Sequence, residues 1–319
     1  MAVGYYDYGE FLRKHFDGKV QKIAIDAGFM CPNRDGTKGY GGCIYCNNQS
    51  FNPAYCRTRI SVAEQIGRGK ELFARKYPQM QYLAYFQAYT NTYANISQLK
   101  QLYEEALNQE GVVGLIIATR PDCMPDELLS YLSQLAQRTF VMVEYGVETS
   151  HDRTLQLINR GHSWADVVDA VQRTAQHRVL CGAHLILGLP GETLSDFTAT
   201  AERISRLPLS TVKLHQLQVI RGTRLAQMYA NGEVELIEWT ADEYIDVCLQ
   251  VLQHLRSDLA VERFVSQSPA DLLVFPRWGM KNYEFTHRLN NRLAGGQIIQ
   301  GSKFRACPAA NVKAEAGSH

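Results

Sequence analysis

Apolar residues in this chain gather in short runs that alternate with amphipathic segments. The runs are rich in β-branched and aromatic residues, which favour strands, and they cover residues 22–26, 82–87, 111–119, 139–148, 181–189 and 212–220. Between them, apolar positions recur with helical spacing over 97–108, at Leu99, Leu102, Ala106 and Leu107, and again over 126–136. Strands that alternate with helices in this way predict parallel βαβ units.

Six such units predict an α/β fold built as a partial (β/α)6 TIM-like barrel, smaller than the closed eight-stranded form. Three further helix starts are predicted from capping-box pairs: Ser61 with Glu64, Ser163 with Asp166, and Thr240 with Glu243. We expect an N-terminal extension over 1–19 and a barrel core over 20–230. The rhythm breaks over 231–319, which predicts a mostly helical capping region with one strand near 260–265 and a disordered tail.

Polar residues follow the apolar runs at the points where the strands should end. A cysteine-rich loop follows the first run, and polar segments at 87–91, 119–122, 148–150 and 188–192 follow later ones. The carboxyl ends of parallel strands meet at one edge of a sheet, and that edge carries the chemistry in such folds. The sequence therefore predicts a functional site there.

Composition narrows the class of protein. The 319 residues include 33 basic and 32 acidic side chains, so no global basic excess announces nucleic-acid binding. No apolar run approaches the roughly 20 residues that a membrane helix needs, and the N-terminus lacks a secretory signal pattern. We therefore expect a cytoplasmic protein with no membrane partner, in which the eight cysteines serve metal binding or catalysis rather than disulfides.

Three of these cysteines, Cys31, Cys43 and Cys46, share one glycine-rich loop. Soft thiolates favour zinc or iron–sulfur, and glycines let the backbone wrap around a bulky group. A structural zinc site closes with a fourth ligand at similar spacing. Cys56 is a candidate but lies outside the glycine-rich stretch. Three thiolates on a four-iron cluster would leave one iron open to another ligand. Zinc, or three unrelated buried cysteines, remains the alternative.

Several segments together resemble the radical S-adenosylmethionine (SAM) superfamily, and within it the YhcC/YtqA-type proteins. They are CPNRDG (31–36), YFQAYTNTYA (85–94), TRPDC (119–123), GVETS (146–150), INRGH (158–162), HLILGLPGET (184–193) and KLHQLQVIRGT (213–223). These proteins are related to the elongator catalytic subunit and to oxygen-independent coproporphyrinogen oxidase. The eleven residues between Cys31 and Cys43 depart from the superfamily's commonest CxxxCxxC spacing, and longer first gaps occur in the elongator branch.

The resemblance implies a ligand set for each cofactor. The three cysteines would hold a 4Fe-4S cluster, and the residues expected around SAM are Tyr45, Gln87, Glu148, Arg160, Gly188 and His215. Tyr45 would pack beside the adenine, and a tight turn at Gly188 would let the backbone approach it. Glu148 would reach the ribose or the methionine part, and the planar fork of Arg160 suits the SAM carboxylate.

Other positions in these segments have weaker assignments. Gln87 stands where many relatives carry a Gly-Gly-Glu motif for the SAM amino group, and its side-chain oxygen is a possible substitute. His184 and His215 lie within strands, and we expect His215 rather than His184 to face the substrate. Arg120 and Asp122 fit a structural ion pair as well as an active-site role. Hydrogen-atom relays at Cys123 or Cys307 are a minor option.

The implied chemistry begins with a one-electron donor, a reductase or a flavodoxin-like protein, which reduces the cluster. SAM is then cleaved to a 5′-deoxyadenosyl radical that abstracts hydrogen from the substrate. The enzyme subclass, oxidoreductase or transferase, stays open. We favour a tRNA wobble uridine as substrate, because the elongator branch modifies that nucleoside. The alternatives are a small metabolite or tetrapyrrole, and a non-catalytic metal-binding interaction protein.

The C-terminal region supplies basic residues interleaved with aromatic ones, a combination that suits a single-stranded RNA loop. The set is Arg263, Arg277, Lys281, Arg288, Arg292, Lys303 and Arg305, with Trp278, Tyr283 and Phe285. A solvated helical face explains the same pattern equally well. We expect this region to close the open side of the barrel, with Arg277 and Trp278 near the opening.

Overall fold

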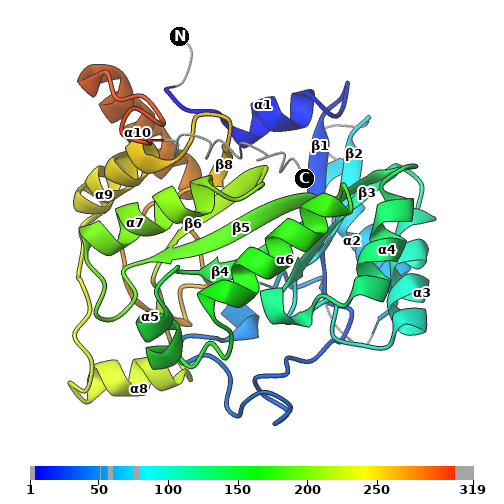
Figure 1. The fold of residues 1–319 in the computed structure, drawn as a ribbon, viewed down its shortest axis with the longest axis horizontal. Helices are drawn as coiled ribbons and strands as arrows, with labels where there is room; N and C mark the ends of the chain where they lie inside the picture. The colour runs from blue at the N-terminus through cyan, green and yellow to red at the C-terminus, as the bar shows by residue number, and fades with distance from the viewer. Residues whose placement is uncertain (1–3, 51, 57–59, 75–78, 306–319) are drawn as a thin grey trace, which may run out of the picture.

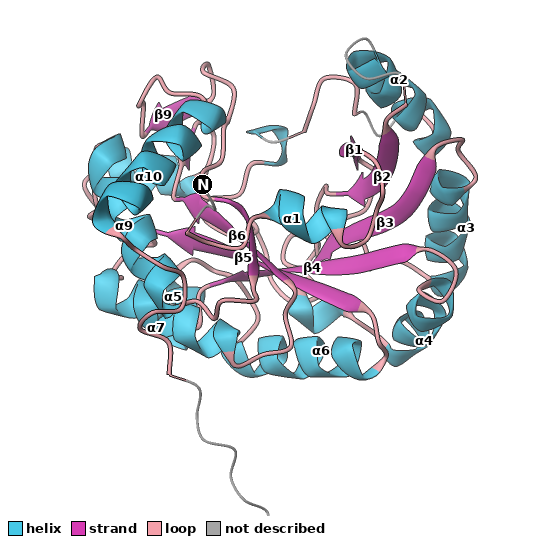
Figure 2. Cartoon of the chain, turned by 90° about the horizontal axis from the view of Figure 1, so that it is seen from above, coloured by secondary structure: helices cyan, strands magenta, loops and turns pink. Residues whose placement is uncertain are grey.

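The computed structural model describes residues 4–50, 52–56, 60–74 and 79–305. Its central element is a parallel sheet of seven strands in the spatial order β1-β2-β3-β4-β5-β6-β8. These strands are β1 (Val20–Ile25), β2 (Gln81–Phe86), β3 (Val112–Thr119), β4 (Phe140–Glu148), β5 (Leu180–Leu187), β6 (Thr211–Gln216) and β8 (Ala260–Arg263). The sheet curls into a half-barrel (Figure 2), so the predicted α/β partial barrel is confirmed.

Helices line the convex side of this curl (Figures 1 and 2). The longer ones are α2 (Val62–Ala74), α3 (Ile96–Leu107), α4 (Asp126–Leu135), α6 (Trp164–Gln176), α7 (Leu194–Ser205) and α9 (Ala241–His254). The helix predicted over 97–108 is α3, which begins after the N-cap Asn95 and buries Leu99, Tyr103 and Ala106 at helical spacing. The capping boxes at Ser163 and Thr240 are confirmed at the starts of α6 and α9.

The concave side of the sheet is filled at one end by the N-terminal segment. Helix α1 (Tyr8–Arg13) lies across the concave side in Figure 2, and its Phe11 packs in a cluster with Leu83, Tyr85 and Met142 from the strands. The Val261 amide of β8 donates to the Tyr6 carbonyl at 2.8 Å. The amino-terminal end of the half-barrel is thus packed, and the carboxyl end is left for chemistry.

The strand predicted over 212–220 is wrong in one respect, because two strands of different sheets occupy it. β6 ends at Gln216, and β7 (Val219–Ile220) pairs antiparallel with β9 (Leu273–Phe275). Gln216 exchanges two 2.8 Å hydrogen bonds with the Ser266 backbone, which ties the segment after β8 to the end of β6. A break at this point brings residues 266–268 to the carboxyl edge of the sheet.

The region 231–319 extends the sheet as well as covering it. The strand expected near 260–265 is confirmed as β8, which pairs in parallel with β6. The remaining helices are α5 (Asp152–Leu157), α8 (Arg224–Ala230) and α10 (Asn282–Gly296), with short 3-10 turns at Asn48–Ser50 and Pro121–Cys123. The expected tail and Cys307 lie outside the described residues. Among the helices of the described chain, none is long and apolar enough to cross a membrane.

Candidate active site

The loop between the first two clustered cysteines folds back on itself. Asp35 and Tyr40 form an antiparallel bridge, and the Gly42 amide donates to the Asn33 carbonyl at 2.8 Å. Gly42 has φ 76°, which a residue with a Cβ rarely adopts, and a Cβ at Gly39 would lie 2.3 Å from Asn33 Oδ1. The eleven-residue gap is therefore a closed hairpin-like excursion that returns the chain from Cys31 to Cys43.

The segment after α5 holds this loop in place. The Asn159 side-chain amide donates to the carbonyls of Tyr40 and Gly42 at 3.1 and 2.8 Å. The Asn33 side chain donates back to the Asn159 carbonyl at 2.5 Å, and the Ile44 amide donates to the Ile158 carbonyl at 3.0 Å. Part of the INRGH motif is thus a clamp on the cysteine loop, a role that its sequence alone did not indicate.

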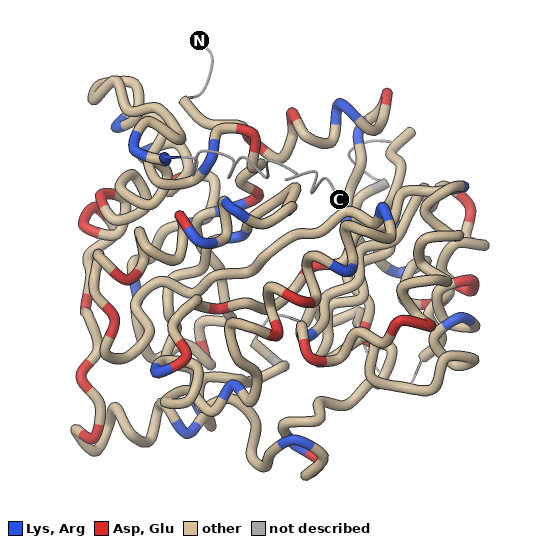
Figure 3. The backbone as a smooth tube through the Cα atoms, viewed as in Figure 1, with Lys and Arg blue, Asp and Glu red and all other residues tan. Residues whose placement is uncertain are grey.

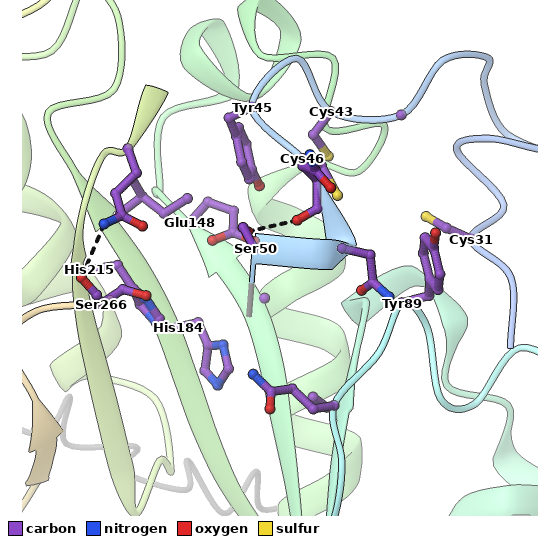
Figure 4. A pocket seen from close by; sticks show the side chains of 18 of the residues that line it. Cys31, Cys43, Tyr45, Cys46, Ser50, Tyr89, Glu148, His184, His215 and Ser266 are labelled. Carbon is purple, nitrogen blue, oxygen red and sulfur yellow. Dashed lines mark hydrogen bonds between the residues drawn. The ribbon is translucent and has the colours of Figure 1, made fainter. Parts of the chain in front are cut away.

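The three thiols face one cavity at the carboxyl edge of the sheet. Cys31, Cys43 and Cys46 all line it, and Figure 4 shows the Cys31 sulfur pointing toward the other two. Within the described residues, no three His, Cys, Asp or Glu side chains are grouped as ligands of one metal ion. A four-iron cluster is wider than a single ion, and its ligands stand farther apart. The all-thiolate donor set of Cys31, Cys43 and Cys46 fits such a cluster.

Beside Cys43 lies a buried arginine with spare donor capacity. Arg160 donates from Nη1 to Cys43 Sγ at 3.8 Å and from Nη2 to the Gly146 carbonyl at 2.6 Å. Its Nη2 also lies 3.3 Å from Glu148 Oε1, while its Nε is buried without a hydrogen-bond partner. Glu148 has φ 66°, a strained conformation for a residue with a side chain. Arg160, with an unpartnered donor, and Glu148, with a strained backbone, both line the cavity, as expected of a site that binds a polar ligand.

The predicted pair Arg120–Asp122 connects Arg160 to the cysteine loop. Arg120 binds Asp122 through two parallel 2.9 Å hydrogen bonds and donates from Nη1 to the Arg160 carbonyl at 2.7 Å. Lys38, inside the cysteine loop, lies 2.9 Å from Asp122 Oδ2. Burial alone would raise the pKa of Asp122, but Arg120 and Lys38 lower it to about 2. The pair is a structural ion pair, and Arg120 also lines the cavity.

Below the floor of the cavity lies a buried charge network that the sequence alone did not predict. Lys213 Nζ lies 2.5 Å from Glu144 Oε2 and 3.3 Å from Glu262 Oε1. Lys22 Nζ lies 3.1 Å from Glu144 Oε1 and 2.6 Å from Glu262 Oε2. Burial lowers the pKa of Lys213 to about 8, although both carboxylates act to raise it. Burial acts to raise the pKa of Glu144, but the two lysines hold it well below its usual range. The signal for this network was a charged residue inside each of three apolar runs.

Above this network stand both strand histidines. His184 Nε2 lies 3.0 Å from Glu144 Oε2, and the rings of His184 and His215 are 5.5 Å apart. Both histidines line the cavity (Figure 4). Arg263 of β8 lines it too, and its Nη2 lies 3.3 Å from His215 Nε2. Burial lowers the pKa of both histidines, so they are neutral at pH 7.

The other expected SAM contacts divide into two groups. Tyr45 and Gln87 line the cavity with the cysteines, and so does Tyr89, which adopts φ 58°. The guanidinium carbon Cζ of Arg34 lies 5.8 Å from the centroid of the Tyr89 ring. Gly188 instead lines a smaller hollow with Trp239, whose Cζ3 would lie 2.9 Å from a Cβ there. The contact of Gly188 with the adenine stays a prediction. The packing of Trp239 explains why a residue without a side chain stands at this position.

The remaining described cysteines do not line the cavity. Cys56 is buried with its Sγ 3.2 Å from Gln65 Oε1, and Cys123 lies 3.7 Å from Asp122 Oδ1. Cys181 and Cys248 are fully buried. A fourth cysteine ligand from Cys56 is thus not part of this arrangement.

Several members of the basic and aromatic set of the C-terminal region lie apart from one another. Arg263 lies in the cavity, whereas Arg288 and Arg292 of α10 lie near Asp242 and Asp246 of α9. Phe285 is buried in the core. Over the face drawn in Figure 3, basic and acidic positions are interspersed. Trp278 lines the hollow beside Gly188 and donates its indole N–H to the Trp239 carbonyl at 2.8 Å. These members of the set thus lie at separate locations, and RNA binding by the region stays a prediction.

A half-barrel whose first strand leads into a three-cysteine loop defines the radical SAM class of enzymes. Residues 31–204 match the Radical SAM superfamily, and residues 209–294 match its C-terminal domain. YtqA of Bacillus subtilis is 34% identical over 301 residues, covering 94% of this chain and 93% of YtqA. YhcC of Escherichia coli K12 is 36% identical over 272 residues, covering 85% and 86%. The chain belongs to the radical SAM superfamily and is an enzyme of its YhcC/YtqA type.

Two further likenesses concern more distant proteins. A tRNA uridine(34) acetyltransferase of Methanocaldococcus infernus is 27% identical over 241 residues, which are 70% of this chain and 44% of that enzyme. The solved structure of the archaeal Elp3 from the same organism superposes with a TM-score of 0.64 at 17% identity, covering 89% of this chain and 64% of that one. The structural likeness is one of fold. Membership of the superfamily implies a 4Fe-4S cluster and SAM.

Proposed function

We propose that this chain holds a 4Fe-4S cluster on Cys31, Cys43 and Cys46, binds SAM beside it, and acts on the wobble uridine of a tRNA. The observation that carries the cofactor part is the convergence of three thiols, and no other described cysteine, on one cavity. When bound, the reduced cluster and SAM supply a 5′-deoxyadenosyl radical that abstracts a hydrogen atom from the substrate.

The residues around the cysteines would bind and orient SAM. The free Nε of Arg160 suits a carboxylate, and Glu148 can accept hydrogen bonds from ribose hydroxyls. Tyr45, between two of the cluster ligands, offers a flat surface for the adenine, and Gln87 offers an acceptor for the amino group. Because Arg160 also contacts Cys43, SAM and the cluster would share one anchored side chain.

Reduction of the cluster calls for a one-electron donor, a reductase or a flavodoxin-like protein. The cysteine loop lies at the protein surface, where Met30 and Tyr40 are 52% and 79% exposed. A donor docked on this loop would stand close to the cluster. The exposed apolar side chains supply contact area for such a transient partner.

The tRNA part of the proposal rests on the similarity to a tRNA uridine(34) acetyltransferase over 70% of the chain. The wall of the cavity is consistent with a splayed base, because Gln216, Gln218 and Ser266 line it together with His215. RNA-modifying proteins read unstacked bases through such polar edges. A small metabolite or tetrapyrrole is the alternative outcome of the test.

The test compares tRNA nucleosides, by mass spectrometry, from the parent strain and from a strain lacking this gene. We expect one modified wobble uridine to disappear or to be replaced by its precursor, and to return when the wild-type gene is restored. A Cys43→Ala gene, expressed to the same level, should fail to restore it. An unchanged nucleoside profile in the deletion strain would contradict the tRNA proposal and favour a small-molecule substrate.

A further inference from the structure

Arg263 is a half-buried cation that forms no ion pair with an acidic side chain among the described residues. Its side chain lines the cavity, its Nη2 lies 3.3 Å from His215 Nε2, and its Nε is buried with no hydrogen-bond partner. An arginine has only donors, so His215 Nε2 must be the acceptor in this contact. A neutral imidazole therefore faces Arg263, and no described carboxylate forms an ion pair with it.

The charges around Arg263 do not balance. The network below it holds two carboxylates, Glu144 and Glu262, and two lysines, Lys22 and Lys213, which pair with one another. Arg263 adds a third cation to this cluster. The floor of the cavity therefore has one positive charge without a matching carboxylate, and taking such a charge even partly out of water costs free energy unless a ligand compensates it.

We propose that Arg263 binds an anionic group of the substrate, a carboxylate or a phosphate, at the floor of the cavity. The proposal deepens the proposed function and rests on it for the identity of the substrate. Ser266 and Ser268 line the same wall, and two 2.8 Å hydrogen bonds between the Gln216 side chain and the Ser266 backbone, one in each direction, fix that segment beside Arg263. An oxyanion in the cavity would meet the planar guanidinium of Arg263, which lines this wall.

The SAM carboxylate is not the expected ligand of Arg263. Arg160, with its own free Nε, lies 3.8 Å from Cys43 Sγ, whereas Arg263 contacts His215 on the neighbouring strand. The two arginines thus define two anion positions in one cavity, one at the cluster and one at the floor. An Arg263→Gln change should therefore leave SAM binding intact.

The first experiment uses the reconstituted full chain with SAM, dithionite and tRNA from the deletion strain. Arg263→Gln is compared with wild type, with Arg263→Lys, and with Arg206→Gln, a control at an exposed arginine of the α7 C-cap. We expect Arg263→Gln to keep SAM-only formation of 5′-deoxyadenosine but to reduce its stimulation by tRNA about ten- to hundredfold, as fits the loss of a charge-assisted hydrogen bond. Arg263→Lys should recover part of it.

Binding of the same tRNA as a function of salt separates the two sources of the anion. If Arg263 binds a backbone phosphate, Arg263→Gln lowers affinity and reduces the salt slope by about one. If it binds a carboxylate on the reacting group, affinity and slope change little while stimulation falls. Wild-type stimulation together with wild-type affinity in Arg263→Gln would overturn the proposal.

A second measurement does not depend on the substrate. Acetate and inorganic phosphate are titrated into the full chain while the imidazole nitrogens of His215 are observed by NMR. We expect one of the two anions to shift the His215 signal in the wild-type protein and not in Arg263→Gln. If tRNA fails to stimulate the wild type, this result still upholds the anion site while the tRNA proposal fails. No shift with either anion would overturn the anion site.

Discussion

Arg160 lies with its Nη1 3.8 Å from the Sγ of Cys43, so the residue expected to bind SAM also touches an expected cluster ligand. The same guanidinium reaches Glu148 at 3.3 Å and leaves its Nε unused. A side chain placed in this way can hold the SAM carboxylate next to the cluster. It also means that a change at this residue can affect either cofactor, so the two effects must be measured separately.

Arg160→Ala should weaken SAM binding by about 1.5–3 kcal/mol, the usual value of a hydrogen bond to a charged group. SAM affinity is measured by equilibrium dialysis, and iron content is determined on the same samples. Arg153→Ala serves as the control, since Arg153 is largely exposed and pairs with Asp196 outside the cavity. Unchanged SAM affinity at full iron content would limit Arg160 to a structural role.

Asp122→Asn should destabilise the protein most at neutral pH. The pKa of Asp122 is lowered to about 2 in the folded chain, against about 3.9 when unfolded, which corresponds to about 2–3 kcal/mol. The stabilisation is fully present above pH 4 and is lost as the pH falls through 2. Urea unfolding at pH 7, 5, 4 and 3 should show a difference between the two proteins that narrows toward acid. A difference in the free energy of unfolding that stays constant with pH would show that the ionised Asp122 is not the source of the stabilisation.

The buried network predicts strong coupling between Glu144 and Lys213, whose charged atoms lie 2.5 Å apart. Glu144→Gln or Lys213→Met alone should each cost about 3–5 kcal/mol, because each leaves the buried network of two carboxylates and two lysines with one unbalanced charge. The double variant should cost less than the sum by about 1–3 kcal/mol. Chemical unfolding of the four proteins measures this cycle. Simple additivity would show that the two side chains are not a coupled pair.

Gly188 and Gly191 form a matched pair for separating packing from ligand binding. Both have positive φ, 92° and 75°, but a Cβ at Gly188 would meet Trp239 at 2.9 Å while one at Gly191 meets nothing within 4 Å. Gly188→Ala should therefore be about 1–3 kcal/mol less stable than Gly191→Ala, the usual cost of overpacking. Thermal unfolding measures this. Equal stabilities, with SAM affinity lost only in Gly188→Ala, would instead support the adenine contact.

Sequence patterns located the strands and the cysteine loop because both depend on neighbours along the chain. Alternating apolar runs define β1 to β6, and the spacing of Cys31, Cys43 and Cys46 is local. The clamp by Asn159 and the packing of Trp239 on Gly188 depend on residues distant in sequence, so no local pattern reports them.

The buried charge network below the cavity is not predicted by the sequence patterns for a different reason. Lys22, Glu144 and Lys213 each sit inside an apolar run, where a single charge does not change the strand prediction. Only the register of the sheet brings them together, since Lys213 pairs with His184 on β5, and Glu144 pairs with Gly182 of the same strand. A charged residue within a strand run of an α/β barrel is therefore worth testing as part of the interior.

The most direct test of the account is iron and SAM chemistry in four matched proteins prepared without oxygen: wild type, Cys31→Ala, Cys43→Ala and Cys56→Ala. We expect about four irons per chain and dithionite-dependent 5′-deoxyadenosine in the wild type and in Cys56→Ala, because Cys56 lies outside the cavity. Both should be lost in Cys31→Ala and Cys43→Ala. Colourless wild-type protein with stoichiometric zinc, or loss of iron in Cys56→Ala alone, would contradict the account.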